Sequence, residues 1–337
     1  MYNKAMEKKP ILIFLGIVIL LIGVIAGLFV SLGFAPKPST ASNSVRADIK
    51  AYAFINPLIY SENARSNDPR LNKLESSMTD YISTIKKADS SSAVSVYFRD
   101  LNSGAWTGVG EDETYKPSSM LKTVAMIAAY KQSETRPGLL SQKLYMKRSP
   151  TAQALFVPDD NEPSGYYSLQ DLIDITIKYS DNDAVDALLS DPGINGEYNQ
   201  IFSLLRLPNI DLSDPDADYM SPKSFSTIFR ALYNSSLLSW GVSENILSLL
   251  SQTTFTDGLV AGVQAGTPVA HKFGENTDEL HDCGIVYHPD NPYLLCVMTK
   301  GSKLDVLESA IAGVSKIAYQ FADQEKTSNV ATTSAAQ

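Results

Sequence analysis

The sequence predicts one α+β domain, preceded by one N-terminal transmembrane helix. Strand-like segments lie near both ends of the folded region and surround a helical middle, a pattern typical of α+β domains. Strands do not alternate with helices in βα units, and no internal repeat is visible. A long apolar run near the N-terminus supplies the membrane segment.

The membrane segment is predicted at residues 11–35, which are almost purely apolar and carry no charge. Such a run is long enough to cross a hydrocarbon core about 30 Å thick. Lys4, Lys8 and Lys9 precede it, so the positive-inside rule places residues 1–10 in the cytoplasm and the rest of the chain outside. A cleaved signal peptide is the alternative, but its apolar region is usually shorter, and Pro36 follows a weak cleavage site. We therefore expect an uncleaved single-pass anchor.

A linker and extended segment is predicted at residues 36–68. It begins with a stretch rich in Pro, Ser and Ala, and its apolar part, residues 52–60, is expected to lie extended against the folded domain or to remain linker. The folded domain is predicted at residues 69–323. The polar residues 324–337 are expected to form a disordered tail.

The elements of the domain follow from hydrophobic periodicity and from turn residues. A helix starts near Pro69, and a hairpin follows at residues 93–99 and 105–110. Pro117 opens a strongly apolar helix at residues 120–130, as proline in a first turn does. The later segments are a helical region at 169–250 that is interrupted at 191–193 and 208–222, strands at 269–273, 284–287 and 293–299, and a closing helix at 305–321.

Composition excludes several classes of function. The net charge is −9, and no basic patch with interleaved aromatic residues is present, so nucleic acid is not expected as a partner. The three histidines, His271, His281 and His288, form no cluster with metal-ligand spacing. We therefore expect no metal and no cofactor. The two cysteines, Cys283 and Cys296, flank a predicted hairpin, and either a cross-strand bridge or two buried thiols would fit.

A Ser-x-x-Lys pattern stands at the start of the apolar helix, in Ser119 and Lys122. This spacing places both side chains on one helix face. A serine hydroxyl needs a base within hydrogen-bond reach, and a lysine among apolar neighbours can lose its proton near neutral pH. The pattern is weak alone, because Ser83 and Lys86 match it too.

Two further patterns follow along the chain. Ser180-Asp181-Asn182 offers a second hydroxyl for proton relay and an amide for a substrate carbonyl, although in isolation it reads as the cap of the next helix. Lys272-Phe273-Gly274 lies on a late strand and has a glycine where a substrate backbone could approach closely.

The order and context of the three patterns resemble the penicillin-recognising family of class A β-lactamases and penicillin-binding proteins. The resemblance covers roughly residues 71–322 and implies a serine β-lactamase-like fold, in which an antiparallel sheet with flanking helices stands beside an all-helical subdomain. It implies that Ser119 is the acylated nucleophile and Lys122 its base. Ser180 and Lys272 would move protons and hold substrate charge.

The same resemblance assigns substrate contacts. Asn182 would bind the substrate amide, and Gly274 and Phe273 would border the substrate on the strand. The backbone N–H groups of Ser119 and Glu275 would form the oxyanion hole. The family and the topology together also predict a bacterial cell membrane as the location, with the catalytic domain outside the cytoplasm.

Two departures from the family pattern affect function. Residues 207–218 correspond to the loop that carries the deacylating glutamate in class A β-lactamases, yet they contain no Glu. Asp211, Asp214 or Asp216 could substitute, but turn and cap chemistry explains them equally well. Phe273 replaces the usual Thr or Ser, whose hydroxyl helps to bind the substrate carboxylate.

The prediction is a membrane-anchored serine hydrolase that forms an acyl-enzyme on β-lactam or D-alanyl-peptide-like amides and deacylates slowly. Its partners would be a β-lactam or peptidoglycan-peptide-like substrate and the membrane. One alternative is a true class A-like β-lactamase with a relocated base. The other is a catalytically silent binding module of the cell envelope.

Overall fold

The computed structural model describes residues 45–46, 52–55, 58–60, 68–149, 162–208 and 217–334. The predicted anchor at 11–35 and most of the linker lie outside these residues. Among the described residues, no helix combines the length and the hydropathy needed to cross a membrane.

A five-stranded antiparallel sheet forms the centre of the domain, in the order β4-β3-β9-β8-β7. An early hairpin, β3–β4, and a late three-stranded meander, β7–β8–β9, build it, and β3 pairs with β9 along its whole length. This confirms the α+β prediction. The strands are β3 (Ala93–Asp100), β4 (Trp106–Val109), β7 (Val269–Glu275), β8 (Glu279–Val286) and β9 (Tyr293–Lys300).

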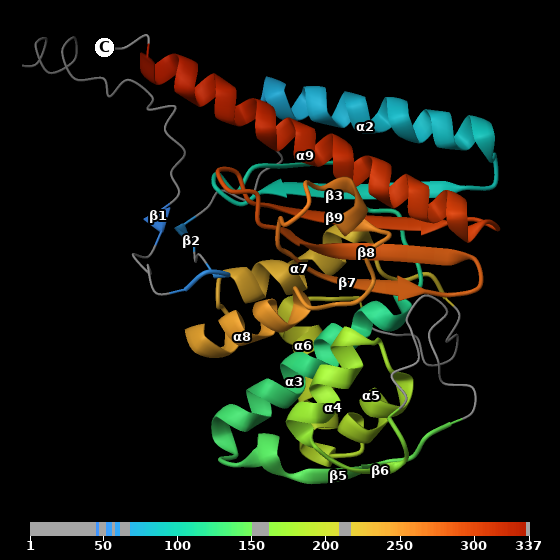
Figure 1. Cartoon of the computed structure of the whole chain (residues 1–337), viewed down its shortest axis with the longest axis vertical. Helices are drawn as coiled ribbons and strands as arrows, with labels where there is room; N and C mark the ends of the chain where they lie inside the picture. Colours follow the sequence, from blue (N-terminus) through green and yellow to red (C-terminus); the bar gives the residue numbers. More distant parts are fainter. Residues whose placement is uncertain are drawn as a thin grey trace, which may run out of the picture. The chain divides into compact units, whose positions relative to one another are not determined.

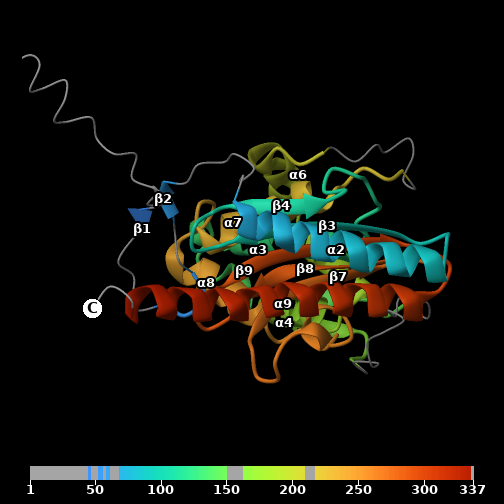
Figure 2. The ribbon, with the colours of Figure 1, turned by 90° about the horizontal axis from the view of Figure 1, so that it is seen from above.

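Two long helices cover one face of the sheet (Figures 1 and 2). They are α2 (Pro69–Ala88) and α9 (Leu304–Ser334), which contact each other. Asp68 caps α2 by accepting a hydrogen bond from the Arg70 N–H, as an N-cap carboxylate does. Helix α9 continues past the predicted end at residue 321 and into the stretch predicted as a disordered tail. Its continuation agrees with the high helix propensity of Ala322, Gln324, Glu325 and Lys326.

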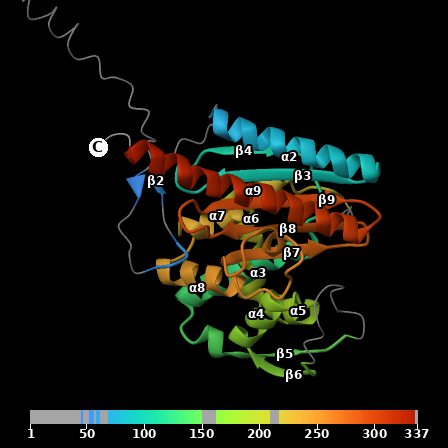
Figure 3. The same cartoon turned by 45° about the horizontal axis from the view of Figure 1, so that its top comes forward.

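The other face of the sheet packs against the helical subdomain (Figure 3). Its helices are α3 (Lys122–Thr135), α4 (Leu169–Lys178), α5 (Asn182–Leu189), α6 (Pro192–Leu205), α7 (Pro222–Tyr233) and α8 (Trp240–Leu250). Every residue of α3 from Lys122 to Tyr130 is buried, and a helix that is apolar on all sides belongs inside a domain. A small hairpin, β5 (Lys143–Met146) with β6 (Gly165–Ser168), was not predicted, because its strands are short and lie far apart in the sequence.

Residues 52–55 pack against the domain. Three consecutive backbone N–H groups, those of Ala53, Phe54 and Ile55, donate to the Glu244 carboxylate of α8 at 2.7–3.0 Å. The Tyr287 hydroxyl donates to the Phe54 carbonyl at 2.9 Å. This part of the extended segment therefore belongs to the fold. The strands β1 (Val45–Arg46) and β2 (Leu58–Tyr60) pair with each other.

Cys283 and Cys296 form a disulfide across β8 and β9, which decides between the two possibilities that the sequence left open. The two residues are direct partners in the antiparallel register and are fully buried. Cys283 is also the register partner of Lys272 on β7. The bridge therefore joins β8 to β9 in the middle of the sheet, and β8 lies next to β7, the strand that carries Lys272.

We expect the double variant Cys283→Ala, Cys296→Ala to lose about 3 kcal/mol of unfolding free energy, the value that closure of a loop of this order gives. Urea denaturation of parent and variant measures the loss. Reduction of the parent should lower its midpoint in the same direction. A parent with two titratable thiols after denaturation without reductant would contradict the bridge.

Candidate active site

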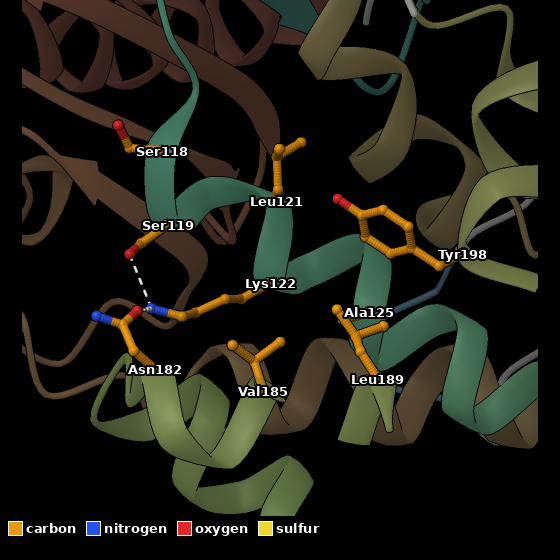
Figure 4. A pocket seen from close by; sticks show the side chains of 9 residues that line it. All are labelled: Ser118, Ser119, Leu121, Lys122, Ala125, Asn182, Val185, Leu189 and Tyr198. Carbon is orange, nitrogen blue, oxygen red and sulfur yellow. Dashed lines mark hydrogen bonds between the residues drawn. The ribbon is translucent and has the colours of Figure 1, made fainter. Parts of the chain in front are cut away.

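Ser119 lies in a 3₁₀ turn, η1 (Ser118–Leu121), directly before α3. The residue before it, Ser118, has a positive φ of 50°, which is unusual for a residue with a side chain and typical of sites where the fold holds strain. Ser119 is half-buried, and its hydroxyl is directed toward the start of α3 (Figure 4). The helix N-terminus adds a positive field where negative charge would develop in a reaction.

Lys122, the first residue of α3, lies at the centre of the site. Its Nζ donates to Ser119 Oγ at 2.8 Å, to the Ser180 carbonyl at 2.6 Å and to Asn182 Oδ1 at 2.6 Å. Its side chain is almost completely buried. Burial lowers the pKa of Lys122 to about 8, while Asp181, Glu275 and Asp186 act in the opposite direction. An amine with this pKa, in contact with a serine hydroxyl, can serve as its base near neutral pH.

The second Ser-x-x-Lys match lies in a different environment. Ser83 and Lys86 lie exposed on α2, and the Ser83 hydroxyl donates to the Thr79 carbonyl within the same helix. The tertiary environment therefore distinguishes the two matches.

The Ser-Asp-Asn segment connects α4 to α5. Asp181 is the N-cap of α5 and accepts the Ala184 N–H at 2.7 Å, so the capping interpretation also holds. The cap fixes Asn182 as the first residue of the helix, and Ser180 takes a positive φ of 56°. Arg148, which no sequence pattern indicated, forms an ion pair with Asp181 and lies 3.6 Å from Asp183. Arg148 thus holds the segment from outside the site.

Ser180 joins the two lysines. Its hydroxyl accepts from Lys272 Nζ at 2.9 Å and lies 3.3 Å from Lys122 Nζ. Lys272 is fully buried, and desolvation together with the nearby Lys122 charge lowers its pKa well below the usual value. A hydroxyl between two amines of lowered pKa is well placed to relay a proton.

Gly274 permits β7 to approach η1. A Cβ at this position would lie 2.5 Å from the Pro117 carbonyl oxygen and 2.8 Å from Met120 Cγ. The sequence suggested a close approach by substrate backbone, whereas in the structure the protein itself occupies the space beside Gly274. Directly after β7, the N–H of Asn276 donates to the Glu279 carbonyl of β8. Successive N–H groups of a strand point to opposite sides. The Glu275 N–H therefore points away from β8, toward the η1 side of this edge strand.

Phe273 points into the core. Its ring is fully buried and stacks on Phe255, with 4.5 Å between the centroids. Lys272 Nζ lies 4.0 Å from the Phe273 ring centroid. The ring therefore gives Lys272 an aromatic face and presents no hydroxyl to a substrate.

A pocket of about 210 Å³ opens beside Ser119. Ser119, Lys122 and Asn182 border it on one side, and the side chains of Leu121, Ala125, Val185, Leu189 and Tyr198 line the remainder (Figure 4). Among the described residues that line it, none carries a carboxylate. Within the described part of the chain, no group of three or more His, Cys, Asp or Glu side chains is arranged to hold a metal ion.

Known proteins resemble this chain in sequence pattern and in fold. The model of the β-lactamase enzyme family matches residues 73–322. A mutant of PBP-A, solved as an acyl-enzyme complex with penicillin G, superimposes with a TM-score of 0.65 at 24% identity, covering 75% of this chain and 97% of that chain. A class A β-lactamase from Mycobacterium abscessus gives a TM-score of 0.63 at 23% identity, covering 72% and 98%. The TLA-1 extended-spectrum β-lactamase gives 0.65 at 21%, covering 74% and 98%. At these identities the structures show a shared fold.

The lowered pKa of Lys122 predicts how Ser119 reactivity depends on pH. Only the neutral amine can accept the serine proton, so the rate should rise about tenfold per pH unit below the pKa and level off above about 8. Acylation of the domain by p-nitrophenyl acetate, followed over pH, measures this profile.

Two variants control for the origin of that profile. Lys122→Arg keeps a permanent charge and should lower the rate by a factor of about 10² or more. Lys86→Arg, in the exposed Ser-x-x-Lys match, should leave the rate unchanged. A profile that survives in Lys122→Arg would assign the titration to another group.

Proposed function

Since the chain belongs to the β-lactamase enzyme family, we propose that it is a serine hydrolase that forms an acyl-enzyme on Ser119 with amides of the β-lactam or D-alanyl-peptide type. The observation that carries the proposal is the hydrogen bond of 2.8 Å between Lys122 Nζ and Ser119 Oγ at an amine whose pKa is lowered to about 8. A silent binding module would not need this amine to be buried against the hydroxyl.

The proposed acylation uses the residues as they lie. Lys122 removes the Ser119 proton as the hydroxyl oxygen attacks the substrate carbonyl carbon. The backbone N–H groups of Ser119 and Glu275 stabilise the oxyanion. Ser180 donates its proton to the leaving nitrogen and regains one from Lys122 or Lys272, to which it is hydrogen-bonded. The leaving group departs on the side of Ser180.

Deacylation is proposed to be slow. The attacking water needs a base, and residues 207–218 contain no Glu. The described part of the pocket lining offers no carboxylate in its place. The candidate aspartates, Asp211, Asp214 and Asp216, lie outside the described residues.

We also propose that the domain works outside the cytoplasm, held by the apolar run at 11–35. The charge-free run behind three lysines supports an anchor. The disulfide between Cys283 and Cys296 supports an oxidising compartment. The native substrate would then be a component of the bacterial cell envelope.

A second candidate function follows from Phe273. Without a hydroxyl at this position, a substrate carboxylate loses one hydrogen-bond donor. The second candidate substrate is therefore an amide or ester that lacks this carboxylate. The buried and stacked ring favours this candidate, because it cannot rotate out without opening the core around Phe255.

Incubation with benzylpenicillin tests the acyl-enzyme. We expect the anchor-free protein to gain the mass of the intact drug and to keep it for hours, because residues 207–218 contain no Glu and the described pocket lining offers no carboxylate to activate water. The Ser119→Ala variant should gain nothing. A transient adduct with accumulating hydrolysed drug would contradict slow deacylation and favour a relocated base.

Phe273→Thr tests the second candidate. Restoring the hydroxyl should speed acylation by benzylpenicillin about tenfold or more, the value of a hydrogen bond to a charged group. The variant should also lose about 3 kcal/mol of unfolding free energy, since a buried ring is removed. Phe255→Leu is the matched control, because it removes the same stacking without adding a hydroxyl and should not speed acylation.

A further inference from the structure

His281 lies beside the chain that leads into the Ser119 turn, and the proposed reaction does not use it. It stands on β8 as the direct register partner of Gly274 on β7, and its imidazole is fully buried. Side chains of register partners stand on the same face of a sheet. Gly274 has no side chain on that face, and Pro117 comes close to it there. The His281 ring therefore reaches the backbone just before η1.

Both ring nitrogens of His281 have partners, and these partners fix the position of the ring proton. Nδ1 accepts the Thr299 N–H of β9 at 3.1 Å, so this nitrogen carries no proton. In a neutral imidazole the proton is then on Nε2, which donates to the Lys116 carbonyl at 3.0 Å. Burial lowers the pKa of His281 to about 4, so the ring stays neutral near neutral pH. The imidazole is thus a fixed bridge from β9 to the Lys116 carbonyl.

A carboxylate near the ring does not change this protonation state. Glu279 Oε2 lies 3.8 Å from His281 Nε2, but Glu279 is itself paired with Lys300 Nζ at 3.2 Å. Lys300 also pairs with Asp218 at 2.9 Å. The positive charge of Lys300 acts against a second positive charge on the ring.

The Lys116 carbonyl determines where the turn begins. Pro117 follows it with φ fixed by its ring, here at −68°. The Ser118 hydroxyl also donates to the Lys116 carbonyl, at 3.4 Å, and Ser118 holds a positive φ of 50°. Such a conformation persists only where the surroundings impose it. A rotation of the Lys116 peptide would therefore be passed on through the rigid proline to Ser119.

Resting on the proposed function, we propose that His281 is a positioning residue for the nucleophile. Its Nε2–H bond to the Lys116 carbonyl holds the turn, so that Ser119 Oγ stays within hydrogen-bond reach of the Lys122 amine. The imidazole contacts neither the hydroxyl nor the amine, and it lies outside the residues that line the pocket. Its loss should slow the acylation step and leave the binding of the acyl donor nearly unchanged.

Two amide variants separate the two bonds of the ring. His281→Gln carries an amide N–H at about the place of Nε2 and keeps the bond to Lys116. His281→Asn carries an amide oxygen at about the place of Nδ1, so it keeps the bond to Thr299 and loses the bond to Lys116. With p-nitrophenyl acetate, we expect His281→Asn to lower the acylation rate at saturation about 10²-fold, because a displacement of about 1 Å at the reacting atoms has this effect. His281→Gln should stay near the parent rate, and the half-saturating concentration should change in neither variant.

His288→Asn is the matched control. His288 is also buried, and its Nδ1 accepts the Asn291 N–H at 3.2 Å while its Nε2 pairs with Asp323 of α9 at 3.0 Å. It therefore loses the same kind of bond far from η1 in the sheet register, beyond the end of β8. Urea denaturation measures the stability of each variant. A rate loss in His288→Asn as large as that in His281→Asn would assign the effect to general destabilisation and overturn the inference.

Hydrogen exchange of the Met120 amide reports on the turn without any substrate. This N–H donates to the Pro117 carbonyl at 3.1 Å and closes the turn, so its protection measures how firmly the turn is held. We expect faster exchange in His281→Asn than in the parent and in His281→Gln.

The outcomes separate this inference from the proposed function. Equal acylation rates in His281→Asn and His281→Gln would overturn the inference and leave the serine hydrolase standing. If neither p-nitrophenyl acetate nor benzylpenicillin acylates Ser119 in the parent, the proposed function is wrong, and the Met120 exchange decides the inference. Unchanged exchange in His281→Asn would then overturn it, and faster exchange would support it.

Discussion

The buried amine of Lys122 is the interaction on which the rest of the site depends. Removing an ammonium group from water is costly unless acceptors surround it, and three elements supply them: η1 through Ser119, the α4–α5 connection through the Ser180 carbonyl, and α5 through Asn182. The same burial that requires these partners lowers the pKa of Lys122. The fixed position of the Lys122 amine beside Ser119 and its lowered pKa therefore have one physical cause, which is the burial of the amine.

The surrounding fold maintains this arrangement at a cost in backbone strain. Ser118 and Ser180 both adopt a positive φ, a conformation that costs a residue with a side chain about 1–2 kcal/mol. Packing holds both in place: Gly274 lets β7 lie directly against Pro117 and Met120, and Arg148 pairs with Asp181 beside Ser180. The disulfide joins β9 to β8, and its Cys283 is the register partner of Lys272 on β7. Strain of this kind gathers where a protein positions reactive groups.

Ser119, Lys122, Ser180 and Lys272 form one hydrogen-bonded network. The sequence carries these four residues in the order of the family pattern. Phe273 departs from that pattern, because its ring packs in the core against Phe255 and lies beside the Lys272 amine. The chain therefore keeps the side chains of the three patterns together and differs at the strand position next to Lys272.

The sequence by itself determined the α+β class, the order along the chain of the five strands of the central sheet and the three patterns that meet at the site, because periodicity, caps and turn residues act over a few neighbouring positions. It could not separate Ser119 and Lys122 from Ser83 and Lys86, since both pairs have the same spacing and differ in their burial. It also could not decide the Cys283–Cys296 bridge, the inward direction of Phe273 or the support from Arg148. Each of these depends on which side chains from distant segments meet, and that is decided by long-range packing and not by local pattern.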